Sequence, residues 1–334
     1  MGTQSALHTS EVSWTVEGIP VYGTYTTPAA GGPFPAVAFV AGSGPTDRNW
    51  NTPLLPGTNG SGGLLAETLT RAGFATLRYD KRASGPHIQE NMAQLMGKVS
   101  LQGHLAELAG AVRLLAGKPE INASQIFGLG NSEGCIHVTN YQVNGAGPKF
   151  AGIILTAPPA NPIGKVAHNQ IAAQLQATPD GQAQLAAYDR AIEDFVAGRQ
   201  VTIDENLPKG MRDVLLAVTT PMNQPFSREL WVLDPAKLVS QVTAPVLIVI
   251  GKKDLQVNWQ TEGAILESVA AQHANFHISF PENANHILKH ETQSLQELSP
   301  VEVQNTYNSD ETSLDPEAVQ IIESWLAEQL QRLA

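Results

Sequence analysis

The sequence predicts an α/β protein with a mostly parallel sheet flanked by helices and a helical insert in its second half. Three observations lead to this prediction. Short continuous apolar runs, typical of strands buried on both faces, alternate with helix-like stretches. An alternating hairpin opens the chain, and a segment rich in Ala and Gln interrupts the later alternation. With 334 residues, 42% of them apolar, the chain can bury a sizeable core.

The first elements are expected to be strands. Residues 12–16 and 21–25 alternate along their length and flank a turn at 17–20, which predicts a β-hairpin. Residues 36–40 form a continuous apolar run suited to a buried parallel strand. The remaining core elements are expected in the order helix 64–69, strand 74–79, helix 105–115, strand 125–129, strand 151–155, strand 246–250 and strand 276–280.

The regularity breaks between about Pro158 and Pro235. This stretch has mainly helical character and is too long for an ordinary connection. We therefore expect residues 159–235 to form a helical cap over the carboxyl edge of the sheet, and residues 1–158 and 236–334 to form the core. The alternative is two ordinary crossover helices with a disordered loop.

Two aspartate–proline pairs predict helix starts. Asp234 precedes Pro235, and Asp315 precedes Pro316. Aspartate is a favourable N-cap, and proline is favourable at the first helical position. The first pair is expected to restart the core after the insert, and the second to open the last helix.

The most informative motif is the G-N-S-E-G stretch at residues 130–134. It follows the apolar strand at 125–129 and precedes a helix-competent run. In such a strand–turn–helix the tight turn requires glycines beside the serine, and the hydroxyl stands at the carboxyl edge of the sheet. A G-x-S-x-G also occurs by chance in roughly one chain in ten of this length. The surrounding pattern makes Ser132 a candidate nucleophile.

A serine nucleophile needs a base, and the base needs an orienting acid. Asp254 follows the strand at 246–250, and His286 lies on the loop after the strand at 276–280. The order serine, acid, histidine predicts a Ser132–His286–Asp254 triad at one edge of the sheet. Taken alone, Asp254 could instead cap the helix that follows it.

The sequence has nine histidines, and position distinguishes them. His277 lies within a predicted strand, where it would pack or face solvent. His290 is near His286 but lies past the loop. The other six have no placement that matches a catalytic base, and they are His8, His87, His104, His137, His168 and His273.

The oxyanion of an acyl-transfer reaction needs two N–H donors. The residue after the nucleophile, Glu133, is expected to supply one. The glycine-rich loop at 41–48 follows the third strand, and the N–H of Ser43 is our choice for the second. No G-K-[ST] sequence follows this loop, so a phosphate-binding loop is not indicated.

Five segments together resemble the bacterial carboxylesterase branch of the α/β-hydrolase superfamily, which is close to the serine aminopeptidase and dienelactone-hydrolase-like groups. The resemblance extends over most of the chain and is carried by residues 42–48, 79–85, 130–134, 254–257 and 285–289. The first segment departs from the usual pattern, because Ala41 stands where many members carry histidine. The resemblance implies the α/β-hydrolase fold, the triad named above and hydrolysis of carboxylic esters.

We therefore expect a serine carboxylesterase that acts on a small-molecule ester through an acyl-enzyme, without a cofactor. Two alternatives stay open: a serine peptidase or amidase with the same triad, and a catalytically silent binding protein on the same fold. Within the insert, at least one of Met222, Phe226 and Trp231 is expected to line the acyl pocket. Alternatively, these three side chains pin the cap to the core.

Charged residues near the strand ends are expected to form structural ion pairs rather than to take part in catalysis. These residues are Asp47, Arg48, Asp80, Lys81 and Arg82.

Composition excludes several classes of function. The formal net charge of −11 argues against nucleic acid or an anionic membrane surface as a partner. The single cysteine, Cys135, leaves no internal disulfide or multi-cysteine metal site, and is expected to be a buried helix residue. The histidine spacing matches no metal motif, so no metal is expected.

No apolar run reaches the length of a membrane span. The first residues contain neither a basic nor an apolar leader region, so we expect a cytoplasmic protein. A leader removed earlier would leave no trace in this sequence.

Overall fold

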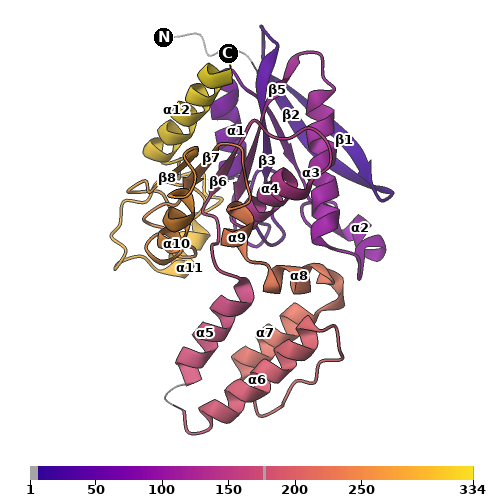
Figure 1. Cartoon of the computed structure of the whole chain (residues 1–334), viewed down its shortest axis with the longest axis vertical. Helices are drawn as coiled ribbons and strands as arrows, with labels where there is room; N and C mark the ends of the chain where they lie inside the picture. Colours follow the sequence, from indigo (N-terminus) through magenta and orange to yellow (C-terminus); the bar gives the residue numbers. More distant parts are fainter. Residues whose placement is uncertain (1–6, 176–177, 334) are drawn as a thin grey trace.

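The computed structural model describes residues 7–175 and 178–333 (Figure 1). The first residues, on which the expectation about a leader depends, lie outside the described part. None of the described helices combines the length and the apolar character needed to cross a bilayer.

Within the described residues, eight strands form one sheet in the order β1-β2-β4-β3-β5-β6-β7-β8. The hairpin β1–β2 is antiparallel, and β2 also pairs antiparallel with β4, whereas the other neighbours are parallel. The predicted mostly parallel sheet is therefore confirmed. The strands are β1 (Leu7–Val16), β2 (Ile19–Pro28), β3 (Phe34–Val40), β4 (Ala75–Tyr79), β5 (Ile121–Asn131), β6 (Gly152–Thr156), β7 (Val246–Val249) and β8 (Phe276–Ser279).

Helices cover both faces of the sheet, which explains the continuous apolar runs of its central strands (Figure 1). In β3, Val37 and Phe39 pack on one face, while Ala36, Ala38 and Val40 pack on the other. The first face is covered by α1 (Ser61–Arg71) and α12 (Pro316–Leu333), and the second by α3 (Leu101–Ala116), α4 (Glu133–Asn144), α9 (Pro235–Val239) and α10 (Thr261–Ala270).

Two further helices have no counterpart in the expected elements. These are α2 (Ile88–Leu95) and α11 (Pro300–Asn305). Both are short, so neither is long enough to show a clear helical period in the sequence.

Residues 159–235 are mainly helical and contain an apolar cluster of their own. Helices α5 (Ile163–Leu175), α6 (Gly181–Val196) and α7 (Lys209–Thr219) pack around Tyr188 and Leu215. They lie together beyond one end of the sheet, and α8 (Phe226–Val232) lies between them and the rest of the chain (Figure 1).

Hydrogen bonds tie α8 and the turn before it to the start of α3 and to the residues just before α3. The N–H of Phe226 donates to the carbonyl of Val99 at 2.7 Å, and the N–H of Gly97 donates to the carbonyl of Pro221 at 3.1 Å. The Glu229 carboxylate accepts from the N–H of Leu101 at 2.6 Å. These bonds fix α8 beside the core segment that carries His104.

Both predicted aspartate caps are confirmed. Asp234 accepts from the N–H of Lys237 at 3.0 Å, and Asp315 Oδ1 accepts from the N–H of Ala318 at 2.9 Å. The other carboxylate oxygen of Asp315 bonds His290 Nδ1 at 2.7 Å. Asp315 therefore joins the start of α12 to the loop after β8.

Replacing Asp315 with Ala is expected to lower the free energy of unfolding by about 1–2 kcal/mol, because α12 loses its N-cap acceptor. Asp315→Asn retains an acceptor oxygen and should lose less. Urea denaturation of both variants measures the difference. Equal losses would mean that the cap is not what Asp315 contributes.

Candidate active site

The backbone turns sharply at Ser132, between the end of β5 and the start of α4. Ser132 has φ 53° and ψ −122°. A non-glycine residue in such a conformation costs on the order of 1–3 kcal/mol and persists only where its surroundings hold it. The N–H of Ser132 donates to the carbonyl of Thr156 at 2.9 Å, and the carbonyl of Ser132 accepts from the N–H of Cys135 at 3.0 Å.

The glycines on either side of this turn are required by close backbone packing. A Cβ at Gly134 would lie 2.3 Å from the carbonyl oxygen of Val40, and a Cβ at Gly130 would lie 2.5 Å from the backbone of Gly134. The first turn of α4 therefore packs directly against the end of β3. This contact brings Ser132 beside Gly42, where an added Cβ would lie 3.3 Å from the Ser132 Cβ.

His286 and Asp254 form a buried hydrogen-bonded pair. His286 Nδ1 lies 2.8 Å from Asp254 Oδ2, and the two residues are 5% and 3% exposed. The other oxygen of Asp254 accepts from the N–H groups of Gln256 and Val257, at 2.7 and 2.9 Å. With Nδ1 donating to the carboxylate, Nε2 of the neutral ring is left as the proton acceptor.

Asn131 joins the serine turn to the histidine loop. Its side-chain Nδ2 donates to the carbonyl of His286 at 3.0 Å and to Thr156 Oγ1 at 3.2 Å. The sequence analysis did not identify this role, since the second position of a G-x-S-x-G motif is unrestricted and the partner lies far along the chain.

Ser132 and His286 line one cavity of about 310 Å³. Its residues come from the two core segments, and none of those that line it lies within 159–235. Tyr307 on its wall accepts from Gln256 Nε2 at 3.0 Å. Burial, together with the nearby Asp254 carboxylate, raises the pKa of the Tyr307 hydroxyl above its usual value, so the phenol remains protonated.

The two expected oxyanion donors come from the loop after β3 and from the first turn of α4. Ser43 lines the same cavity, and Glu133 is the first residue of α4. Neither main-chain N–H has a hydrogen-bond acceptor within residues 7–175 and 178–333.

A second cavity of about 350 Å³ lies where α8 meets the core. It shares Gly44 and Pro45 with the first cavity, and Glu133 forms part of its wall. From the insert, Met222 and Phe226 line it.

Trp231 lies elsewhere. Its indole makes a perpendicular contact with Phe195 at 6.0 Å and packs so closely on Gly164 that an added Cβ there would lie 2.4 Å from the indole nitrogen. Of the three expected pocket residues, the structure thus brings two to a cavity beside Glu133 and packs the third inside the insert.

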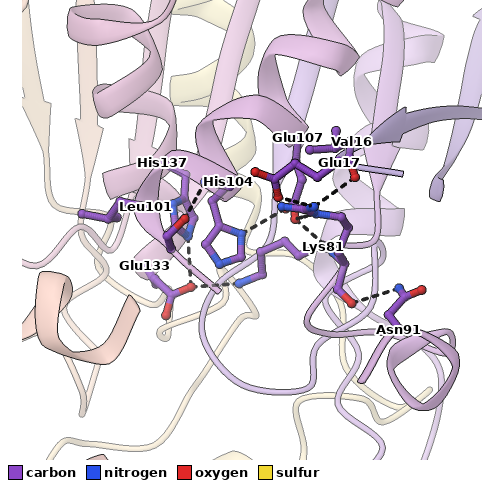
Figure 2. A network of polar contacts seen from close by, with 12 residues as sticks. Val16, Glu17, Lys81, Asn91, Leu101, His104, Glu107, Glu133 and His137 are labelled. Atoms are coloured by element: carbon purple, nitrogen blue, oxygen red, sulfur yellow. Dashed lines mark hydrogen bonds and ion pairs between the residues drawn. The ribbon is translucent and has the colours of Figure 1, made fainter. Parts of the chain in front are cut away.

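A buried charged network lies beside the second cavity (Figure 2). Lys81 Nζ donates to Glu133 Oε1 at 2.9 Å and to the carbonyl of Gly42 at 2.8 Å, and His137 Nε2 lies 3.1 Å from the same Glu133 oxygen. Burial alone would raise the pKa of Glu133, but Lys81 and His137 hold it well below its usual value. Burial and the neighbouring His104 lower the pKa of His137 to about 4, so a neutral ring donates to the carboxylate.

The network continues through His104 to α3 and the first hairpin. His104 Nδ1 bonds Glu107 at 3.0 Å, and Arg82 Nε donates to Glu107 at 2.8 Å. Burial opposes ionisation of Glu107, yet His104 and Arg82 lower its pKa to about 2. Arg82 also pairs with Glu17 at 2.9 Å.

Four of the five charged residues expected to form structural ion pairs do so. Arg48 pairs with Asp80 at 2.7 Å, Lys81 with Glu133, and Arg82 with Glu107. Asp47 is different, because its carboxylate accepts from the N–H groups of Asn49 and Asn51, at 2.8 and 2.9 Å.

The remaining expectations concern residues near Ser132 in the sequence or in the fold. His277 is exposed on β8, and His290 is hydrogen-bonded to Asp315 through Nδ1. Cys135 is buried in α4, and burial raises the pKa of its thiol well above the usual range. Among the described residues, no group of three or more His, Cys, Asp or Glu side chains is arranged to hold a metal ion.

Comparison with known proteins identifies the fold. No protein-family model matches the chain. The structure of Est1E from Butyrivibrio proteoclasticus superposes with a TM-score of 0.55 at 16% identity and covers 96% of this chain and 99% of Est1E. A proline iminopeptidase from Mycobacterium smegmatis gives a TM-score of 0.56 at 15% identity and covers 97% of this chain and 100% of that protein. The chain has the α/β-hydrolase fold.

A curated relative supports the same superfamily relationship. Esterase EstD from Thermotoga maritima is 26% identical over 274 residues, which are 82% of this chain and 59% of EstD. This chain therefore spans about three fifths of the relative it matches. The predicted relationship to the α/β-hydrolase superfamily is confirmed. In an α/β-hydrolase the serine turn, the acid after a late strand and the histidine loop meet at one sheet edge.

Gly134 and Gly210 are each the second residue of a helix, which makes them a matched pair. Gly134→Ala is expected to destabilise the fold by more than about 1 kcal/mol, because the new Cβ would overlap the Val40 carbonyl. Gly210→Ala meets open space and should be neutral or stabilising by up to about 1 kcal/mol. Thermal unfolding of the two variants measures both effects, and similar shifts would contradict the proposed packing.

Proposed function

We propose that the protein is a serine carboxylesterase that hydrolyses small-molecule carboxylic esters through an acyl-enzyme. The observation that carries the proposal is the cavity that holds both Ser132 and His286, with His286 hydrogen-bonded to the buried Asp254. The relationship to EstD, which is an esterase, adds support.

In the first half of the reaction, Ser132 Oγ attacks the ester carbonyl carbon while His286 Nε2 takes the hydroxyl proton. Asp254 holds the ring and stabilises the imidazolium. The tetrahedral oxyanion accepts hydrogen bonds from the N–H groups of Ser43 and Glu133. Its collapse breaks the bond to the alcohol oxygen, which receives the proton from His286, and the acyl group remains on Ser132.

In the second half, His286 takes a proton from water, and the hydroxide oxygen attacks the acyl carbon. Collapse releases the carboxylic acid and returns the proton to Ser132 Oγ. In enzymes of this kind, each oxyanion donor is worth about 2.7–4 kcal/mol of transition-state stabilisation. In this proposal the N–H groups of Ser43 and Glu133 are the two donors, and neither bonds an acceptor among residues 7–175 and 178–333.

The second cavity is our proposed acyl pocket. It meets the first cavity at Gly44 and Pro45, and Met222 and Phe226 give it an apolar wall. An apolar pocket discriminates acyl chains by about 1–3 kcal/mol per methylene. In this proposal the insert selects the acyl group, while the core performs the chemistry.

Replacing Ser132 with Ala is expected to reduce turnover of p-nitrophenyl esters by on the order of 10⁴-fold or more, because the triad acts as a unit. Circular dichroism and thermal unfolding serve as the control that the variant is folded. A folded variant that keeps a large share of its activity would contradict the assignment of the nucleophile. A fluorophosphonate that labels wild type but not Ser132→Ala would exclude a silent binding protein, and matched amides would separate an esterase from an amidase.

Truncating Met222 or Phe226 to Ala is expected to change the ratio of kcat/KM for short and longer p-nitrophenyl esters by about 10-fold or more. Trp231→Ala should lower stability without changing this ratio, because the indole packs inside the insert. Leu216→Ala, at an exposed apolar residue of α7, is the control for a neutral change. A ratio that stays fixed in both pocket variants would place the acyl group elsewhere.

A further inference from the structure

We propose that Lys81 is a positioning residue that holds both oxyanion donors in place for the reaction described above. The inference rests on the proposed function and extends it to a buried group that acts through the two donors. Its basis is that one buried ammonium bonds the two segments that supply the donors, the loop after β3 and the first turn of α4.

The first contact controls the direction of the Ser43 N–H. The carbonyl of Gly42 and the N–H of Ser43 belong to one trans peptide group, so they point in opposite directions. Lys81 Nζ donates to this carbonyl at 2.8 Å. The bond holds the carbonyl toward Lys81 and thereby directs the Ser43 N–H away from the lysine.

This peptide needs an external restraint because glycines lie on both sides of Ser43. Gly42 lacks a side chain, and Gly44 has φ 82°, a value that glycine adopts without strain. A rotation of the peptide plane would turn the Gly42 carbonyl toward Ser132 and remove the donor. Lys81 opposes this rotation with a charge-assisted hydrogen bond.

The second contact fixes the other donor. Lys81 Nζ donates to Glu133 Oε1 at 2.9 Å, and His137, one turn further along α4, bonds the same oxygen. The Glu133 side chain is thus held by the lysine and by its own helix. Its main-chain N–H is held at a fixed position relative to the Gly42–Ser43 peptide.

Charge adds to the geometry. Lys81 is only 4% exposed, so its hydrogen bonds are little screened by water. An amide whose carbonyl accepts from a cation becomes a stronger N–H donor, because hydrogen bonds in series polarise one another. Lys81 therefore both orients the Ser43 N–H and strengthens it toward a developing oxyanion.

The neighbours of Lys81 make the arrangement stiff. Asp80 accepts from the N–H of Arg48 at 2.7 Å and from its guanidinium at 2.7 and 2.9 Å. Arg82 is bonded to Glu107 of α3. Consecutive residues after β4 thus hold the loop of residues 42–48 at both ends and attach it to a core helix.

The test compares kcat and KM in wild type and in Lys81→Met, which keeps an unbranched but slightly shorter side chain and removes the charge and the donors. We expect kcat to fall on the order of 10²-fold, as for loss of one oxyanion donor, with KM changed less than about 3-fold. Lys149→Met is the control, since Lys149 also bonds backbone carbonyls, those of Tyr141 in α4 and of Gly145 just after it, at the far end of the helix. It should leave kcat unchanged.

A second variant separates positioning from stability. Lys81→Met leaves the Glu133 carboxylate without its cation, which can unfold the protein. Lys81→Met/Glu133→Gln removes that unpaired charge but still lacks the Gly42 bond, so the loss of kcat should persist. Glu133→Gln alone keeps the Lys81–Gly42 bond and should lose less than about 10-fold.

The ratio of activity on an oxygen ester to activity on the matching thionoester reports on the oxyanion donors. A purely structural role of Lys81 would leave this ratio unchanged. In a thionoester the developing charge sits on sulfur, which fits oxyanion donors poorly. Wild type should therefore prefer the oxygen ester, and both Lys81 variants should lose most of that preference. If the wild type hydrolyses esters but kcat is unchanged in the Lys81 variants, this inference fails and the proposed function stands. The same holds if the variants lose equal activity on the oxygen ester and the thionoester. A wild type that hydrolyses no ester would overturn the proposed function and this inference together.

Discussion

The main-chain contact between the first turn of α4 and the end of β3 is the constraint on which the rest of the site depends. Only glycine at residue 134 lets α4 approach β3 so closely, and only glycine at residue 130 lets the end of β5 lie so near the first turn of α4. Together these contacts hold Ser132 in its strained conformation. The same contact places Gly42 beside Ser132 and brings the loop after β3 to the start of α4. Strain at the serine and assembly of the surrounding site are therefore a single structural feature.

Buried charged residues after β4 stabilise the contact between α4 and the end of β3. Burying an unpaired charge is costly, and the residues after β4 avoid that cost because each is paired with the element it holds. Asp80 holds the loop after β3, Lys81 holds that loop and α4, and Arg82 holds α3. Replacing such pairs with apolar side chains would often preserve stability, but it would remove the directional bonds that fix the loop. The network is thus better understood as a device for precise placement than as a source of stability.

The aromatic ring of Phe226 brings residues 159–235 into contact with this network. The ring of Phe226 lies 4.8 Å from that of His104 and 5.8 Å from that of His137, so α8 packs directly on the buried histidines. A ligand in the second cavity would contact the insert on one side and Lys81 and Glu133 on the other. Changes in the insert can therefore alter the shape of this cavity while the pair of His286 and Asp254 stays intact.

The sequence by itself determined the features that depend on local pattern. Continuous apolar runs predicted the buried strands, because a strand covered on both faces needs apolar side chains at consecutive positions. The aspartate–proline pairs at 234–235 and 315–316 predicted two helix starts, because N-capping depends on residues that are neighbours in the sequence. The G-N-S-E-G motif and the order of Ser132, Asp254 and His286 along the strands indicated which side chains belong at one edge. Tertiary structure alone decided the contacts between distant segments: Lys81 with Gly42, Asn131 with His286, and Trp231 with Phe195. No local pattern encodes these contacts, since each depends on the final packing of elements far apart in the chain.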